Sequence, residues 1–244
     1  MTRGQSEPQL LREDAEAFDV LRDAAADHHG LPPGIVEKDY WSTEILRSAT
    51  RPIEGATDLI FKGGTSLSKA FGIIQRFSED VDLLVVTELT GNPLKRLLRS
   101  VADQATERNG PPHLREREGK GYLNARYSYP TRASIDFLSD GMLLEMGCRG
   151  GPLPNQCRVV ESLLGSAAEY VAEGSRAEYS DLATFEVTVL APERTLAEKL
   201  AFDHHRASTR PTRTTPRRGP PLVRHLPTLE RRRHGCGSPG RHLG

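Results

Sequence analysis

The chain has few cysteines and no long apolar run. Its three cysteines, Cys148, Cys157 and Cys236, form neither a paired nor a metal-like spacing. A sparse, odd set argues against a disulfide framework and indicates a reducing compartment. No apolar run approaches the roughly 20 residues that a membrane-spanning helix needs, and the N-terminus lacks an apolar signal core. The sequence therefore predicts a cytoplasmic protein with no membrane partner.

Lysine is missing from the end of the chain, where arginine is abundant. Residues 206–244 contain ten arginines, no lysine and one acid, so the formal net charge of zero divides into +9 here and −9 over residues 1–205. The same end is rich in proline and glycine, and we expect residues 207–244 to form a disordered tail. An alternative interpretation is a basic arm that binds nucleic acid phosphates, although it has no aromatic residues for stacking.

Hydrophobic periodicity predicts a mixture of helices and strands in the body of the chain. Helices are expected at 8–29, 35–49, 66–75, 93–108, 156–172 and 192–206. Strands are expected at 58–62, 80–87, 122–128, 134–137, 143–146 and 184–190. We interpret the charged cluster Glu37–Asp39 as a solvated helix start. The 244 residues, of which 36% are hydrophobic, suit one large α+β domain or such a domain with a helical extension.

A glycine turn in the segment Phe61–Val86 is the first half of the most informative motif. The turn Gly63–Ser66 follows a predicted strand and opens a helix. Glycines let a phosphate approach the backbone closely, and the free N–H groups at a helix start attract anions. Hydroxyl and ammonium groups nearby can add donors. The residues that this pattern suggests for phosphate binding are Lys62, Gly63, Gly64, Thr65, Ser66 and Lys69.

An acidic strand forms the second half. Side chains alternate along a strand, so Ser78, Asp80 and Asp82 share one face, and the apolar residues between them face the core. Mg²⁺ prefers oxygen ligands and combines one or two carboxylates with substrate phosphates. Two ions about 4 Å apart can stabilise both the attacking and the leaving oxygens of an in-line displacement. A third carboxylate often completes such a site, and Asp136 and Glu145 are the candidates. Together the two halves predict metal-dependent nucleotidyl transfer.

These motifs resemble the AbiEii/AbiGii toxin family, a branch of the polymerase-β-like nucleotidyltransferases. The matching segments are Val36–Trp41, Lys62–Lys69, Phe77–Val85 and Pro192–Leu200. The resemblance spans roughly residues 30–205 and implies a polymerase-β-like core with a mixed sheet, followed by a helical C-terminal domain. The division of the chain that we expect is an N-terminal helical segment at 1–50, a core at 51–190, the start of the helical domain at 191–206 and the tail at 207–244.

The resemblance also implies an activity and roles for residues. Family members are toxins of type IV toxin–antitoxin or abortive-infection systems, and some relatives transfer nucleotides from NTP to the 3′ end of tRNA. An NTP, an RNA acceptor such as tRNA, and a cognate antitoxin are therefore the expected partners. The implied catalytic residues are Asp80, Asp82, Glu145 and Lys199. The implied Mg²⁺ ligands are Asp80, Asp82 and Glu145, with Asp136 as the alternative third carboxylate. The resemblance implies that Gly64 and Ser66 hold the triphosphate. Together with the pattern of the turn and strand, the candidate nucleotide-binding residues are Lys62, Gly63, Gly64, Thr65, Ser66, Lys69 and Ser78.

The end of the chain departs from the family pattern. The family continues with further helices and an Arg-Asp-x-x-Asp-like motif, which this sequence does not contain. We hypothesise a change of reading frame near residues 203–212, in which case the helical domain is incomplete. Two alternative functions follow from the same motifs. One is a nucleotidyltransferase that acts on a small molecule, and the other is an inactive remnant that only binds nucleotide.

Overall fold

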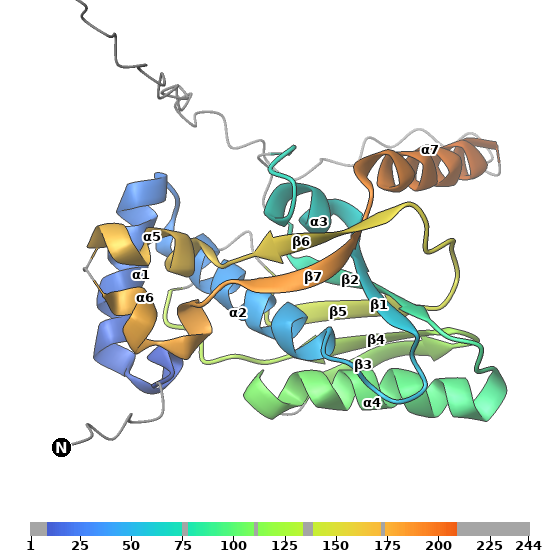
Figure 1. The fold of residues 1–244 in the computed structure, drawn as a ribbon, viewed down its shortest axis with the longest axis horizontal. Helices are drawn as coiled ribbons and strands as arrows, with labels where there is room; N and C mark the ends of the chain where they lie inside the picture. Colours follow the sequence, from blue (N-terminus) through green and yellow to red (C-terminus); the bar gives the residue numbers. More distant parts are fainter. Residues whose placement is uncertain (1–8, 75–77, 110–111, 134–138, 172–173, 209–244) are drawn as a thin grey trace, which may run out of the picture.

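A seven-stranded mixed β-sheet forms the centre of the molecule (Figure 1). The computed structural model describes residues 9–74, 78–109, 112–133, 139–171 and 174–208. The strands are β1 (Asp58–Lys62), β2 (Asp80–Val86), β3 (Pro112–Gly119), β4 (Tyr122–Tyr127), β5 (Met142–Gly147), β6 (Asn155–Val160) and β7 (Phe185–Leu190). Their order across the sheet is β3-β4-β5-β2-β1-β7-β6.

The strand directions make the sheet mixed. β2 runs parallel to β5 and antiparallel to β1, and β1 in turn runs parallel to β7. β3, β4 and β5 form an antiparallel meander at one edge, and β6 pairs antiparallel with β7 at the other. The prediction of an α+β fold with a mixed sheet is confirmed.

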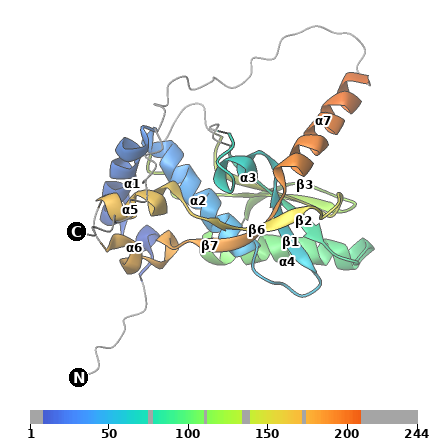
Figure 2. The ribbon, with the colours of Figure 1, turned by 45° about the horizontal axis from the view of Figure 1, so that its top comes forward.

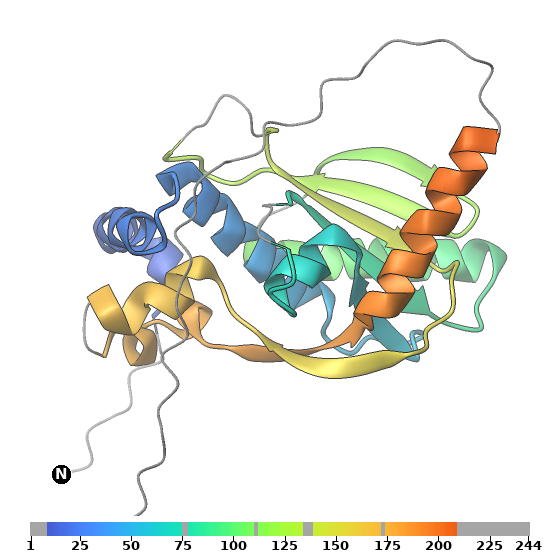
Figure 3. The ribbon, with the colours of Figure 1, turned by 90° about the horizontal axis from the view of Figure 1, so that it is seen from above.

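Helices surround the sheet, and two of them, α2 and α4, cover one of its faces. The described helices are α1 (Ala15–His29), α2 (Pro33–Ala49), α3 (Gly63–Lys69), α4 (Gly91–Asn109), α5 (Leu163–Val171), α6 (Ser175–Glu178) and α7 (Pro192–Ser208), with short 3-10 helices at Leu11–Glu13 and Ser180–Leu182. α2 and α4 pack against each other and against the sheet, while α1 packs on α5. α7 follows β7 and leaves the sheet on the side away from α4, as Figures 2 and 3 show.

The apolar faces of the predicted elements form one continuous core. On α4, Leu94, Leu97, Leu98 and Val101 are all buried, and they belong to the same cluster as the buried apolar residues of β2 and β4. Burying each leucine contributes roughly 1.5–3 kcal/mol. The same core extends from Leu11 to Val189, so the N-terminal helices share it with the sheet. The division into segments at 50, 190 and 206 stays a prediction.

Two predicted elements differ from the structure. The helix expected over 156–172 is wrong in its first part, because β6 occupies residues up to Val160 and pairs with β7. The helix there begins only after Ser162, whose hydroxyl accepts from the Gly165 N–H at 2.9 Å. β3 was not predicted, since charged residues alternate along it without an apolar face. The strand expected at 134–137 lies outside the described residues.

Most other boundaries agree within a few residues. The first helix begins at Ala15 instead of residue 8, because the Asp14 side chain accepts from the Ala17 N–H and caps it there. The helix expected at 66–75 occupies Gly63–Lys69 instead. Within the described part of the chain, no helix is both long and apolar enough to cross a membrane.

Candidate active site

Three carboxylates lie on the face of the sheet opposite α4. Asp80 and Asp82 belong to β2, whose intervening residues are buried in the core. Strand β5 pairs with β2 in parallel, and its register sets Glu145 directly beside Asp82. Paired residues of neighbouring strands point to the same face of a sheet. The register therefore brings Glu145 to the acidic pair. Asp136, the alternative third carboxylate, lies outside the described residues.

Burial and the neighbouring carboxyl groups raise the pKa values of Asp80 and Asp82. Burial raises the pKa of Asp82 to about 7, the Lys62 ammonium lowers it in part, and Glu145 and Asp80 raise it again. Asp82 and Glu145 are also close enough to share a side-chain hydrogen bond. Burial raises the pKa of Asp80 as well, with Glu145 as the next cause. In the metal-free protein this group is therefore an electrostatic cost that a cation would relieve.

The donors suit a hard divalent cation by their chemistry. All are carboxylate oxygens, which Mg²⁺ prefers, and their mutual repulsion is what a bound cation neutralises. In the described part of the chain, no group of three or more acidic, histidine or cysteine side chains already stands in a metal-holding arrangement. The fit to Mg²⁺ thus rests on the type and burial of the donors.

The glycine turn packs directly against the acidic strand. Gly63 has φ +81°, and a Cβ at this position would lie 2.0 Å from Asp82 Oδ2. Only glycine allows this approach without moving the carboxylate. At Gly64, a Cβ would lie 3.5 Å from Ser78 Oγ and 3.7 Å from Lys199 Nζ. The turn, the start of the acidic strand and α7 therefore meet at one point.

The hydroxyl groups of the turn bond within the protein. Thr65 and Ser66 are buried. The Thr65 hydroxyl donates to the backbone carbonyl of Asp80, and Ser66 Oγ donates to the Gly63 carbonyl at 2.9 Å. These bonds fix α3 to the acidic strand and shape the turn. Ser78 is the hydroxyl residue that lies next to Gly64.

The two lysines of the turn lie in different places. Lys62 pairs in register with Asp82 across β1 and β2. Lys69 is buried at the other end of α3, and its ammonium donates to Asp39 Oδ1 and Thr43 Oγ1, each at 2.7 Å. The structure does not bring Lys69 to the carboxylates. Its ammonium also donates to the Glu161 carbonyl at 3.3 Å, so it holds α3 against α2 and the chain before α5 instead.

The interpretation of Glu37–Asp39 as a solvated helix start is wrong, because all three side chains are buried. Glu37 accepts from the backbone N–H groups of residues 132 and 133 at 2.8 and 2.7 Å. Lys38 donates to Glu79, the residue before Asp80. Asp39 binds Lys69 and accepts from the Leu163 N–H at 2.7 Å. Each of these three charges therefore holds a different segment against α2.

Asn124 is a site residue that the sequence did not reveal. Its side-chain amide donates to Glu145 Oε1 at 2.6 Å from the neighbouring strand β4. Nothing in the order of residues links positions 124 and 145, and only the strand pairing does so. For Glu37–Asp39 a signal did exist, because this cluster lies inside the segment Val36–Trp41 that carries part of the family resemblance.

Comparison with a solved structure identifies a relative of the same fold. The fold is similar to that of MenT4, a nucleotidyltransferase toxin from Mycobacterium tuberculosis H37Rv, with a TM-score of 0.51 and 20% sequence identity. The similarity covers 74% of this chain and 58% of MenT4, so this chain spans less than two thirds of that protein. No curated protein sequence matches the chain.

A family comparison covers most of the chain, including the whole site apart from Glu37–Asp39. The model of the family "Nucleotidyl transferase AbiEii toxin, Type IV TA system" matches residues 45–226. This region contains the glycine turn, the acidic strand, Glu145 and Lys199, and it is more than half of the chain. The chain therefore belongs to the AbiEii nucleotidyl transferase toxin family of type IV toxin–antitoxin systems.

Proposed function

We propose that this protein transfers a nucleoside monophosphate from an NTP to an RNA acceptor, with the 3′ end of tRNA as the acceptor. In this proposal it acts in the cytoplasm as the toxin of a toxin–antitoxin pair. The observation that supports it best is the meeting of Gly64, Ser78 and Lys199 beside Asp82. A glycine turn with a free backbone face, a hydroxyl donor, an ammonium and a carboxylate group are the parts that phosphoryl transfer needs.

The carboxylates would hold the metal. Asp80, Asp82 and Glu145 would bind one or two Mg²⁺ ions, which supply neutralising charge to the reacting phosphate when bound. Asn124 holds Glu145 through its amide and so orients that carboxylate. The Lys38–Glu79 pair fixes the chain immediately before Asp80.

The glycine turn and α7 would hold the triphosphate. Gly63 lets the turn approach the Asp82 carboxylate, and Gly64 lies beside Ser78 and Lys199, where it would present its backbone to the phosphates. The Ser78 hydroxyl donates to one oxygen, and the Lys199 ammonium neutralises the leaving pyrophosphate. The acceptor hydroxyl then forms a bond to the α-phosphorus as the bond to pyrophosphate breaks. Lys69 is not part of this set, because its ammonium is engaged with α2.

The test is transfer of label from α-labelled NTPs to total RNA, with each of the four NTPs in turn. We expect Mg²⁺-dependent labelling of RNA that Asp80→Ala and Lys199→Ala abolish. The matched control is Asp27→Ala, an exposed carboxylate at the end of α1. Equal labelling by the wild type and Asp80→Ala would contradict the proposal, and so would an absence of labelled RNA.

A small-molecule acceptor is the second candidate function. The charge of −9 over residues 1–205 favours it, because an acidic body disfavours a broad contact with RNA. The same assay separates the candidates when a metabolite extract is added. Label on small molecules alone would favour the second candidate, and nucleotide binding without any transfer would favour an inactive remnant.

A further inference from the structure

Side chains of the β3–β4 hairpin continue the row of the active-site residues across the sheet. Arg117 pairs with Asn124, Asn124 with Glu145, and Glu145 with Asp82. Residues paired in register point to the same face. Arg117 and Asn124 therefore lie on the carboxylate side of the sheet, while α4 covers the other side of the hairpin. We call Arg117, Tyr122, Asn124 and Arg126 the hairpin platform.

Tyr122 presents an aromatic ring on this platform. Tyr122 is 37% exposed as a residue, and its ring lies over Gly119, where a Cβ would be 2.3 Å from Tyr122 Cε1. Its partner on β5 is Gly147. Because glycine flanks Tyr122 on both neighbouring strands, no side chain at either paired position covers the ring. The strand register also makes Tyr122 and Glu145 diagonal neighbours, roughly 7–8 Å apart.

The platform is cationic on the side that faces the carboxylates. Arg117 and Lys120 are exposed. Arg126 pairs with Leu143, and Leu143 pairs with Asp80, so Arg126 and Asp80 point to the same face of the sheet. Arg126 Nη1 donates to the Asp140 carbonyl at 2.6 Å. Glu118 is in register with the buried Leu123, so it points to the α4 side of the hairpin. There both of its carboxylate oxygens accept from Arg99 of α4, at 3.0 and 2.9 Å. Its charge is therefore compensated on the opposite face.

The position of the platform separates it from the triphosphate residues. In the strand order β4-β5-β2-β1, the carboxylates occupy the two middle strands. The glycine turn follows β1 on one side, and Lys199 reaches it from α7. The platform lies on the other side. A substrate on the platform and an NTP at the turn would thus approach the carboxylates from opposite directions.

We propose that the hairpin platform binds the acceptor strand, a single-stranded RNA end with one base stacked on Tyr122 and phosphates at Arg117 and Arg126. This inference rests on the proposed function. An exposed aromatic ring beside cations is the combination that binds single-stranded nucleic acid, whereas a small alcohol would need neither. The spacing of Tyr122 from Glu145 places the terminal hydroxyl of that strand at the carboxylates.

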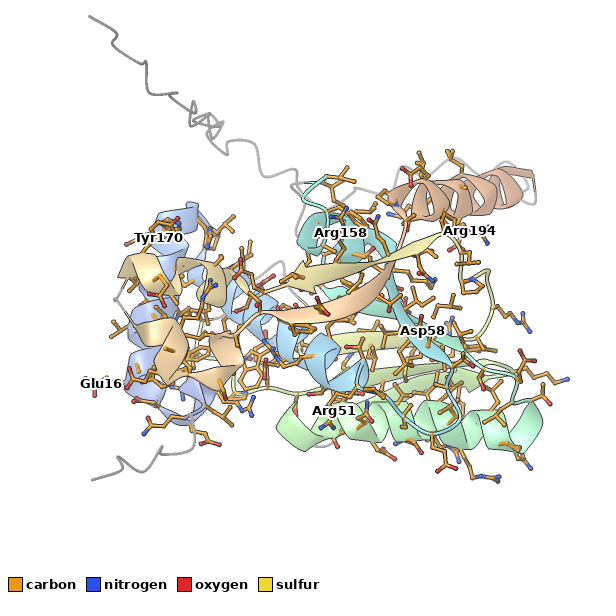
Figure 4. All side chains as sticks on the ribbon, viewed as in Figure 1. Glu16, Arg51, Asp58, Arg158, Tyr170 and Arg194 are labelled. Carbon is orange, nitrogen blue, oxygen red and sulfur yellow. The ribbon has the colours of Figure 1, made fainter. Side chains whose placement is uncertain are left out.

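The test measures binding of a short 5′-fluorescent single-stranded RNA by anisotropy, and binding of a non-hydrolysable NTP by calorimetry. We expect Tyr122→Ala to weaken RNA binding about tenfold and Tyr122→Phe to restore it. Arg117→Ala should reduce the slope of log affinity against log salt by about 0.7. NTP affinity should stay within twofold in all variants. The control Arg51→Ala removes an exposed arginine near α4, labelled in Figure 4, and should leave RNA binding unchanged.

Several results would overturn the platform. One is an unchanged RNA affinity in both Tyr122→Ala and Arg117→Glu, and another is an equal loss of RNA and NTP affinity. Absence of RNA binding by the wild type, or competition by small alcohols alone, would do so too. Because Arg117 is exposed, Arg117→Glu should fold even if Tyr122→Ala does not, so the platform can still be tested.

The platform and the proposed function can fail separately. RNA binding at the platform without label transfer would contradict only the proposed function. Label transfer with an unchanged RNA KM in these variants would contradict only the platform.

Discussion

At the scale of single residues, the site shows a conflict between stability and proposed function. Asp82 is a poorly solvated carboxyl beside Asp80 and Glu145, and these surroundings raise its pKa to about 7. Nothing in the core requires an acid there, because the apolar residues of β2 point to the other face. Such a destabilising group is typical of a site that exists to bind a ligand.

Asp82→Asn should stabilise the metal-free protein. The pKa of Asp82 is higher in the folded chain than the ordinary 3.8, so its contribution lowers stability progressively as the pH rises from about 4 to 7. We expect the variant to gain on the order of 4 kcal/mol at about pH 8 and little at about pH 4. Thermal unfolding in the presence of a chelator measures this. A lower melting temperature for the variant at high pH would contradict the account.

Mg²⁺ should stabilise the wild type but not Asp82→Asn. A ligand that binds the folded state raises its melting temperature. We expect Mg²⁺ to raise the melting temperature of the wild type and to leave that of Asp82→Asn nearly unchanged. Equal shifts in both proteins would show that Mg²⁺ binds elsewhere.

Substitutions at Gly63 and Gly64 should separate fold from nucleotide binding. An added Cβ at Gly63 meets Asp82 Oδ2 at a positive φ, so Gly63→Ala should cost about 1–3 kcal/mol of stability. At Gly64 the nearest atoms are 3.5 Å away or more. Gly64→Ala should therefore fold normally and weaken NTP binding, because its methyl group occupies the space beside Ser78 and Lys199. Urea denaturation and NTP titration together check both outcomes.

At the scale of elements, α2 positions the site through its buried charges. Lys38 reaches the chain before β2, and Asp39 reaches α3 and the start of α5. Removing one partner of a buried ion pair leaves an uncompensated charge, which costs more than the pair itself contributes.

Breaking the Asp39–Lys69 pair should therefore destabilise the fold by about 3 kcal/mol in Asp39→Asn or Lys69→Met. The double variant should recover part of this loss, since no charge is left unpaired. The exposed Arg115–Asp103 pair is the matched control, and Arg115→Ala should cost less than about 1 kcal/mol. Strictly additive losses in the double variant would contradict a coupled pair. Urea denaturation provides the measurement.

Local patterns predicted the elements whose side chains repeat with a clear period. β1, β2 and α4 carry runs of apolar residues at strand or helix spacing, and the shared face of Asp80 and Asp82 follows from alternation alone. Periodicity alone is ambiguous over a stretch as short as residues 156–160, and pairing with β7 makes these residues a strand instead of the expected helix. The burial of Glu37–Asp39 and the contact between Asn124 and Glu145 depend on long-range packing, which no local pattern contains.

At the scale of the whole molecule, the described core residues all precede the arginine-rich end of the chain. The hydrophobic core lies between Leu11 and Val189, and Lys199 lies on the first half of α7. Two leucines of α7, Leu196 and Leu200, are more than half exposed. The reading-frame change near residues 203–212 stays a hypothesis, and sequencing of the gene that finds one intact frame would contradict it.

Removal of residues 209–244 should leave the fold and NTP binding intact. The core residues and the residues of the glycine turn all precede this segment. We expect the shortened protein to keep its melting temperature within about 2 °C, which corresponds to less than about 1 kcal/mol, and to bind NTP as the full chain does. A large loss of either would show that the segment contributes to the site. Loss of RNA binding alone would support the alternative of a basic arm.

The most direct test of the account is label transfer from NTP to RNA by purified wild type, Asp80→Ala, Lys199→Ala and Asp27→Ala. The account predicts Mg²⁺-dependent labelling by the wild type and by Asp27→Ala, and at least a hundredfold less by the two site variants, which lose a metal ligand and a phosphate cation. Labelling that persists in Asp80→Ala or Lys199→Ala would contradict the assignment of this face of the sheet as the active site.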